Sequence, residues 1–146
     1  MKPKIYCNPL PLPNYQPGMA IPKPELVAWG WSRTNHQDYR EMADPTVIRF
    51  HDRYYLFPSC GMCWYSDDLV DWTYYPIEPR DPGYAPTVVE KDGWLYMTAC
   101  SDRMWRARDP LGPWEEIGII KDENGERFFW QDPCLFVDDD STLYCY

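Results

Sequence analysis

Apolar positions along the chain form short runs bounded by prolines and polar turns, and this arrangement occurs three times. Each unit opens with a proline, continues through a short apolar run, crosses a polar turn and returns in an aromatic-rich run. The three units start at Ala43, Ala85 and Gln131. Short apolar runs separated by turn residues are typical of β-hairpins. The pattern therefore predicts the same hairpin three times and an all-β chain.

A second repeated segment follows the hairpin in the first two units. Trp64 and Trp105 lie 41 residues apart, and Trp72 and Trp114 lie 42 residues apart. In both units a strand runs into a turn, and a tryptophan begins the next strand. Two hairpins give four strands per unit, and a period of about 40–45 residues is typical of a β-propeller blade. We expect the tryptophans that recur with the repeat, including Trp72, Trp94 and Trp114, to be core residues.

The repeat divides the chain into a leader and a partial propeller domain, residues 43–146. Residues 1–42 contain seven of the 16 prolines and no repeat unit, so we expect them to cross the propeller face or supply a closing strand. The predicted blades are blade one at about residues 43–76, blade two at about 84–118 and blade three from about 129. A closed propeller needs at least four blades. The chain is therefore expected to be a fragment that supplies about two and a half blades.

The charge balance argues against two classes of partner. Asp and Glu outnumber Lys and Arg by 23 to 14, which gives a net charge of -9, and no basic run occurs. Attraction to nucleic acid or to an anionic membrane is therefore not expected. No apolar run reaches the length of a signal peptide or a membrane span, so the predicted location is cytoplasmic.

Six cysteines are expected to be reduced thiols in such a compartment. Cys60 and Cys63 have the CxxC spacing of a redox or zinc motif, but no second cysteine or histidine pair follows at zinc-site spacing. His36 and His51 are too few and too far apart in sequence to indicate a metal site. No metal ligand and no required cofactor are predicted.

The carboxylates that could carry chemistry are Asp44 and Asp132, each immediately before a proline at the start of an innermost strand. Innermost strands line the propeller channel, so side chains at their starts should converge on one pocket. Asp before Pro is also a common start for a turn. Ala85, however, occupies the equivalent place in blade two, so the repeat itself does not require an aspartate. Carboxylates flanking a sugar ring are what glycoside hydrolysis requires.

Several motifs at blade spacing together resemble glycoside hydrolase family 43, over about residues 40–146. They are Asp44-Pro45, the turn from Ser66 to Trp72, Tyr84-Ala85-Pro86, Asp132-Pro133 and the turn from Asp138 to Asp140. The resemblance implies a five-bladed propeller that hydrolyses glycosidic bonds with inversion at the anomeric carbon. It implies that Asp44 is the general base, and that Asp132 orients the general acid and keeps the pKa of that acid high.

The resemblance places the general acid, a glutamate, in a fourth blade beyond Tyr146. The glutamates at 90, 115, 116, 123 and 126 lie in turns, an outer strand or the interblade loop, and none is expected to replace it. This chain alone is therefore expected to be inactive, because loss of acid catalysis costs on the order of 10²–10⁴-fold in rate.

By the same analogy the substrate is an oligosaccharide that contains arabinose or xylose. Trp130, Tyr84 and Trp64 are candidate flat surfaces for a sugar ring, with packing between blades as the alternative. The resemblance is also compatible with a calcium ion in the channel, although no residue identifies its ligands.

Two alternatives remain. One is a propeller that binds carbohydrate without cleaving it. The other is a protein-interaction propeller, which is less well supported because the WD and kelch signatures are missing. Glycosidase propellers that act on fructosides are harder to separate from the first interpretation. Because an incomplete ring exposes apolar blade edges, self-association is also expected.

Overall fold

The computed structural model describes residues 12–13, 43–59, 62–78 and 82–146, in which ten strands form three antiparallel sheets and no helix occurs. No helix able to cross a membrane is therefore found in these residues. Apart from Leu12 and Pro13, the predicted leader lies outside the described residues.

The first sheet has four strands in the order β1-β2-β3-β4. Their bounds are β1 Thr46–Phe50, β2 Arg53–Phe57, β3 Met62–Ser66 and β4 Thr73–Pro76. The turn before β4 is held by two side chains, because Ser66 Oγ accepts from the N–H of Leu69 at 2.8 Å and Asp68 Oδ1 accepts from the N–H of Asp71 at 2.9 Å. Ser and Asp side chains commonly satisfy turn N–H groups in this way.

The second sheet repeats the first, in the order β5-β6-β7-β8. Its strands are β5 Thr87–Lys91, β6 Trp94–Thr98, β7 Arg103–Ala107 and β8 Glu115–Ile119. Asp92 and Gly93, which connect β5 and β6, have φ values of 53° and 73°. Two consecutive positive φ angles in a two-residue hairpin turn match the right-handed twist of the strands, which explains the Asp-Gly sequence.

The third sheet contains two strands, β9 Leu135–Val137 and β10 Leu143–Cys145, with Phe136 opposite Tyr144. Leu135 is buried, whereas Phe136 and Tyr144 are 47% and 39% exposed. One face of this hairpin therefore meets the second sheet, and the other presents apolar side chains to solvent. Self-association through such a surface stays a prediction.

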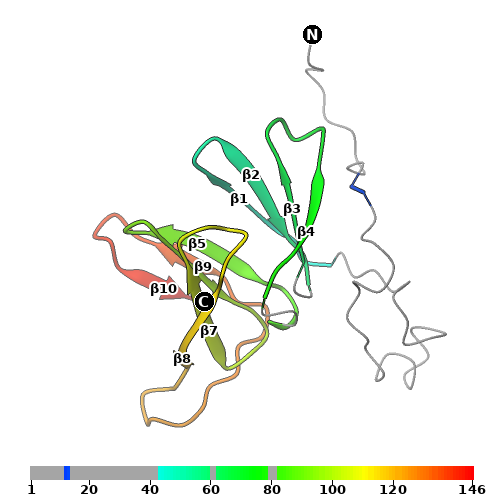
Figure 1. Cartoon of the computed structure of the whole chain (residues 1–146). Helices are drawn as coiled ribbons and strands as arrows, with labels where there is room; N and C mark the ends of the chain where they lie inside the picture. The colour runs from blue at the N-terminus through cyan, green and yellow to red at the C-terminus, as the bar shows by residue number, and fades with distance from the viewer. Residues whose placement is uncertain (1–11, 14–42, 60–61, 79–81) are drawn as a thin grey trace, which may run out of the picture.

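The three sheets are arranged radially around a common axis, as Figure 1 shows. Their innermost strands are neighbours in sequence order, because β1 contacts β5 and β5 contacts β9. This arrangement confirms the predicted fold class, an all-β partial propeller with two four-stranded blades and the first hairpin of a third.

The apolar core lies mainly between the first and second blades. Phe57 of β2 is 1% exposed and meets the edge of Trp114, with ring centroids 6.1 Å apart and an interplanar angle of 90°. Trp72 and Trp114 are both buried, as predicted.

The prediction that Trp94 belongs to the core is wrong. Its ring is only partly buried and contacts two guanidinium groups, those of Arg106 and Arg108, at 4.3 Å and 3.7 Å from the ring centroid. Because Trp94 begins β6 beside the turn, it can meet these arginines through cation–π contacts at the rim of the blade.

Removing the Phe57 ring should destabilise the packing between blades. We expect Phe57→Ala to lower the free energy of unfolding by about 3–5 kcal/mol, because it leaves a cavity against Trp114. Chemical denaturation followed by tryptophan fluorescence measures this change. Ile117→Ala is the matched control: Ile117 is 42% exposed, so its truncation should change stability by about 0.5 kcal/mol or less. Equal losses in the two variants would contradict the interblade core.

Candidate active site

The residue before the opening proline of each blade has an unusual backbone conformation. Asp44, Ala85 and Asp132 have φ values of 48°, 46° and 49°, and each precedes a proline. A left-handed conformation costs a residue with a Cβ roughly 1–2 kcal/mol, and a following proline restricts it further. Ala85 shares this conformation, so it belongs to the repeat and not to the aspartates. Strained residues of this kind often occur at functional sites.

Ala85 and Asp132 are each hydrogen-bonded to a side chain of the preceding blade. Ser59 Oγ accepts from the N–H of Ala85 at 3.2 Å and donates to the carbonyl oxygen of Ala43 at 3.2 Å. Cys100 Sγ accepts from the N–H of Asp132 at 3.2 Å and donates to Asp132 Oδ1 at 3.5 Å. Ser59 and Cys100 occupy equivalent places, just after the second strand of their blades.

Threonines on the innermost strands add a second link between blades. Thr46 Oγ1 donates to the carbonyl oxygen of Pro86 at 2.7 Å. Thr87 Oγ1 accepts from the N–H of Leu135 at 3.0 Å. The links made by the threonines and by Ser59 and Cys100 fix where the side chain at each blade start projects.

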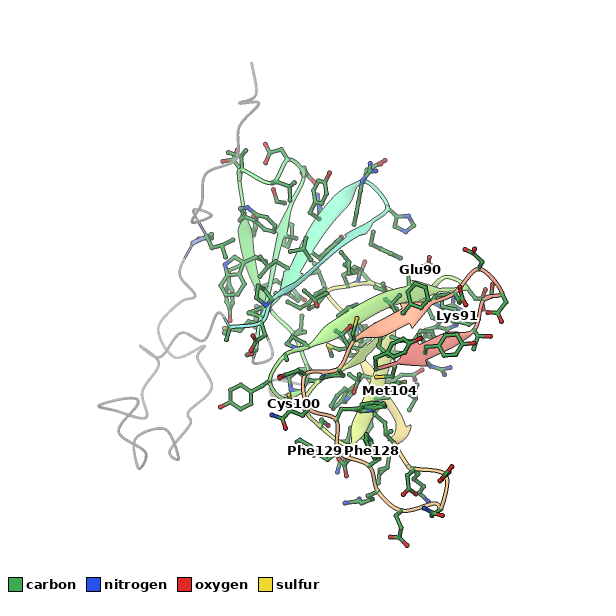
Figure 2. The ribbon with its side chains drawn as sticks, turned by 180° about the vertical axis from the view of Figure 1, so that it is seen from behind. Glu90, Lys91, Cys100, Met104, Phe128 and Phe129 are labelled. Atoms are coloured by element: carbon green, nitrogen blue, oxygen red, sulfur yellow. The ribbon has the colours of Figure 1, made fainter. Side chains whose placement is uncertain are left out.

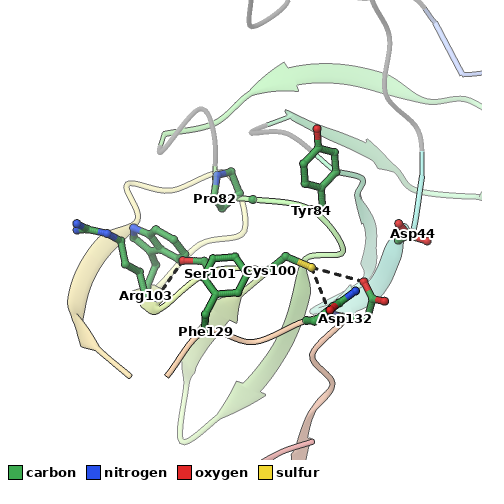
Figure 3. A pocket seen from close by; sticks show the side chains of 11 residues that line it. Asp44, Pro82, Tyr84, Cys100, Ser101, Arg103, Phe129 and Asp132 are labelled. Carbon is green, nitrogen blue, oxygen red and sulfur yellow. Dashed lines mark hydrogen bonds between the residues drawn. The ribbon is translucent and has the colours of Figure 1, made fainter. Parts of the chain in front are cut away.

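The aspartates from blades one and three line one open cavity of about 690 Å³ (Figure 3). Its lining comprises Asp44, Pro82, Gly83, Tyr84, Cys100, Ser101, Arg103, Trp105, Phe129, Gln131 and Asp132. Three residues predicted from the sequence, Asp44, Tyr84 and Asp132, are therefore brought together. Their catalytic and binding roles stay predictions.

Phe129, and not the predicted Trp130, supplies the aromatic side chain of the approaching segment. Phe129 and Gln131 both line the cavity and Trp130 does not; instead Trp130 packs against Phe128 with ring centroids 4.8 Å apart. In extended chain, alternate side chains point to opposite sides. The Phe129 side chain is 65% exposed. Figure 2 labels Phe128, Phe129 and Cys100 near the second blade.

Trp64 does not support the prediction that it binds a sugar ring. It is 0% exposed, and its indole N–H donates to the carbonyl oxygen of Pro13 at 2.9 Å. The ring packs with Tyr74, at a centroid distance of 5.2 Å, in a core cluster of the first blade. A ring without accessible surface cannot offer a face to a ligand.

Arg103 is the one cation among the described residues that line this cavity, and it was not predicted from the sequence. Its Nη1 donates to both carboxylate oxygens of Glu116, at 2.7 Å and 2.6 Å. Its main-chain N–H also bonds Ser101 Oγ at 2.9 Å. Because Glu116 neutralises the guanidinium, the two aspartates determine the charge of the cavity.

No glutamate lines the cavity among the residues that the structure describes. Glu116 is paired with Arg103, Glu115 is paired with Arg106, and Glu90 caps the N–H of Gly93 at 2.7 Å. The carboxylates of these three glutamates therefore bond to groups outside the pair of aspartates.

Metal-binding residues do not gather in the described ranges, where no group of three His, Cys, Asp or Glu could hold an ion. Cys60 and His36 lie outside those ranges, so the CxxC motif is described only at Cys63. Cys63 is 0% exposed, and burial raises the pKa of its thiol far above the ordinary value. It is therefore a packed, unreactive thiol.

The Cys100 thiol has a raised pKa, first because it is partly buried and then because the Asp132 and Asp44 carboxylates lie nearby. A carboxylate close to a thiol disfavours the thiolate. That both aspartates affect Cys100 agrees with their position around one cavity.

Comparison with solved structures supports the same fold. The chain superimposes on a family 43 glycoside hydrolase, the YxiA protein of Bacillus licheniformis, with a TM-score of 0.55 and 21% identity, over 73% of this chain and 34% of that one. An endo-1,5-α-L-arabinanase from Thermotoga petrophila gives a TM-score of 0.55 and 19% identity, over 73% and 35%. An exo-1,5-α-L-arabinanase from a bovine ruminal metagenomic library gives 0.53 and 23%, over 72% and 46%.

These likenesses show that the chain has the fold of family 43 glycoside hydrolases, which confirms the resemblance seen in the sequence. The chain spans between about a third and a half of the length of these three structures. No protein-family model and no curated protein matches the sequence.

The contact between Cys100 and the aspartates can be measured without an activity assay. In Asp132→Asn we expect the pKa of Cys100 to fall, because the negative charge is removed while the N–H donor remains. The rate of alkylation by iodoacetamide, followed at the Cys100 peptide by mass spectrometry, should reach half its maximum at a lower pH than in the wild type. Asp52→Asn, at an exposed turn in blade one, is the control and should leave that midpoint unchanged. An unchanged midpoint in Asp132→Asn would contradict the contact.

Proposed function

We propose that this chain forms part of a glycosidase that hydrolyses O-glycosidic bonds, with inversion, in oligosaccharides containing arabinose or xylose. The observation that carries the proposal is that Asp44 and Asp132, from blades one and three, line the same cavity as Tyr84 and Phe129. Carboxylates supply the acid–base chemistry of glycoside hydrolysis. Aromatic rings suit the apolar C–H faces of sugars.

In the proposed reaction Asp44 is the general base. It takes a proton from a water molecule, whose oxygen attacks the anomeric carbon while the bond to the leaving oxygen breaks. A separate acid protonates that leaving oxygen. In inverting enzymes the base and the acid are about 6.5–9.5 Å apart, which leaves room for the water. Asp132 is proposed to orient the acid and to raise its pKa through like charge.

The proposal requires an acid that the described residues do not supply to this cavity. We assign that role to a glutamate in the sequence beyond Tyr146, from a blade that faces Asp44 and Asp132 across the channel. The lack of a glutamate among the described lining residues equally favours a second candidate function, a propeller that binds oligosaccharides without cleaving them.

The substrate class rests on the names of the similar structures. Two are arabinanases that act on 1,5-α-L-linked arabinan, and another is an exo-β-1,3-galactanase. Arabino-oligosaccharides are therefore the first substrates to test, followed by xylo-oligosaccharides and β-1,3-galacto-oligosaccharides.

Replacing the proposed base should abolish hydrolysis while binding persists. In the full-length protein we expect Asp44→Asn to lower kcat on 1,5-α-L-arabino-oligosaccharides by about 10²–10⁴-fold, because the water is no longer activated. Reducing-sugar release measures the rate, and isothermal titration calorimetry measures binding. Asp52→Asn, at an exposed turn outside the cavity, should retain the wild-type rate. A wild-type protein that binds these oligosaccharides without cleaving them would support the binding propeller instead.

Phe129 should contribute to substrate affinity and Phe128 should not. Truncation of Phe129 removes an aromatic wall of the cavity, so we expect Phe129→Ala to weaken oligosaccharide binding by roughly fivefold, on the scale of about 1 kcal/mol for an aromatic contact. Phe128→Ala is the control, because Phe128 is also exposed but does not line the cavity. Calorimetric titration measures both affinities. Equal affinity for Phe129→Ala and the wild type would argue against this placement of the sugar.

A further inference from the structure

Asp132 follows a largely exposed connection between the second and third blades. Residues 121–129, 131 and 132 are exposed, and Trp130 is only partly buried. The main-chain N–H of Trp130 donates to the carbonyl oxygen of Ser101 at 3.1 Å, and the next tie to the second blade is the N–H of Leu135 on Thr87. Between these two points, Asp132 is hydrogen-bonded to Cys100 of the second blade.

Cys100 contacts Asp132 at two atoms. Its sulfur accepts from the main-chain N–H at 3.2 Å, and its thiol donates to Oδ1 at 3.5 Å. The first contact fixes the backbone at the strained φ of 49°. The second limits rotation of the carboxylate. Figure 3 shows both contacts as dashed lines. One side chain thereby restrains both the position and the orientation of Asp132.

Blade one provides an internal comparison. Ser59 makes the same bond to the N–H of Ala85, but its hydroxyl donates to a carbonyl oxygen of its own blade. Ser59 has no carboxylate to contact at this junction, because the residue that it holds is Ala85. The bond to the N–H is thus common to the repeat, whereas the bond to a carboxylate occurs only where the next blade begins with an aspartate.

We propose that Cys100 is a positioning residue that holds the Asp132 carboxylate in its working orientation within the cavity. This role rests on the proposed glycosidase function, in which Asp132 acts on the general acid. A misplacement of about 1 Å in such a group can lower the rate by up to about a hundredfold. Substrate contact is not required of Cys100, so its loss should change kcat and leave KM unchanged.

Three variants of the full-length protein separate positioning from simple stabilisation. Cys100→Ala removes both contacts and should lower kcat on arabino-oligosaccharides by about ten- to a hundredfold at unchanged KM. Cys100→Ser keeps an acceptor and a donor at the same place, so it should restore most of that loss. Ser66→Ala removes a hydrogen bond in the turn before β4, outside the cavity, and should lower Tm with kcat unchanged.

The outcomes distinguish this role from the function on which it rests. Absence of hydrolysis by the wild-type protein would overturn the proposed function, and the positioning role with it. Hydrolysis by the wild type with an unchanged kcat in Cys100→Ala would overturn the positioning role alone. The same conclusion would follow if Ser66→Ala lowered kcat as much as Cys100→Ala, or if Cys100→Ser failed to recover activity.

Discussion

A hydrogen bond from the first residue of each following blade to the preceding blade determines the geometry of this protein. The acceptors, Ser59 and Cys100, lie just after the second strand of their blades. The residues they hold, Ala85 and Asp132, have left-handed conformations before proline, which a free chain would rarely adopt. Because each blade fixes the start of the next, the innermost strands lie in sequence order around the propeller axis. The side chains at their starts therefore lie around the same axis.

The candidate site follows from this constraint. Asp44 and Asp132 are separated by 88 positions in the sequence, yet they line the same cavity because blades one and three direct their first side chains toward it. The strain is present at Ala85 as well, so the fold supplies the conformation at every junction. The aspartates then place a negative charge at two of the three positions, beside the aromatic rings of Tyr84 and Phe129.

The sequence predicted the blades well because their signals are local. Prolines, the Asp92-Gly93 turn and the spacing of tryptophans depend on neighbouring residues, and they led to the correct fold class. They also placed Asp44 and Asp132 at the starts of strands, from which both line one cavity. Which face of an extended segment meets a cavity is a tertiary property, so Phe129 was missed and Trp130 was chosen. The buried position of Trp64 is likewise a tertiary property, because its indole N–H donates to Pro13, 51 positions away in the sequence. Comparing Cys100 with Ser59 in the repeat could have identified the former.

The most direct test of this account is a crystal structure of the full-length protein with a 1,5-α-L-arabino-oligosaccharide, using Asp44→Asn to prevent turnover. The account predicts a sugar ring between Tyr84 and Phe129, with its anomeric carbon facing positions 44 and 132 and the thiol of Cys100 on the Asp132 carboxylate. An oligosaccharide bound only elsewhere, such as beside Trp94 at the rim of the second blade, would contradict it.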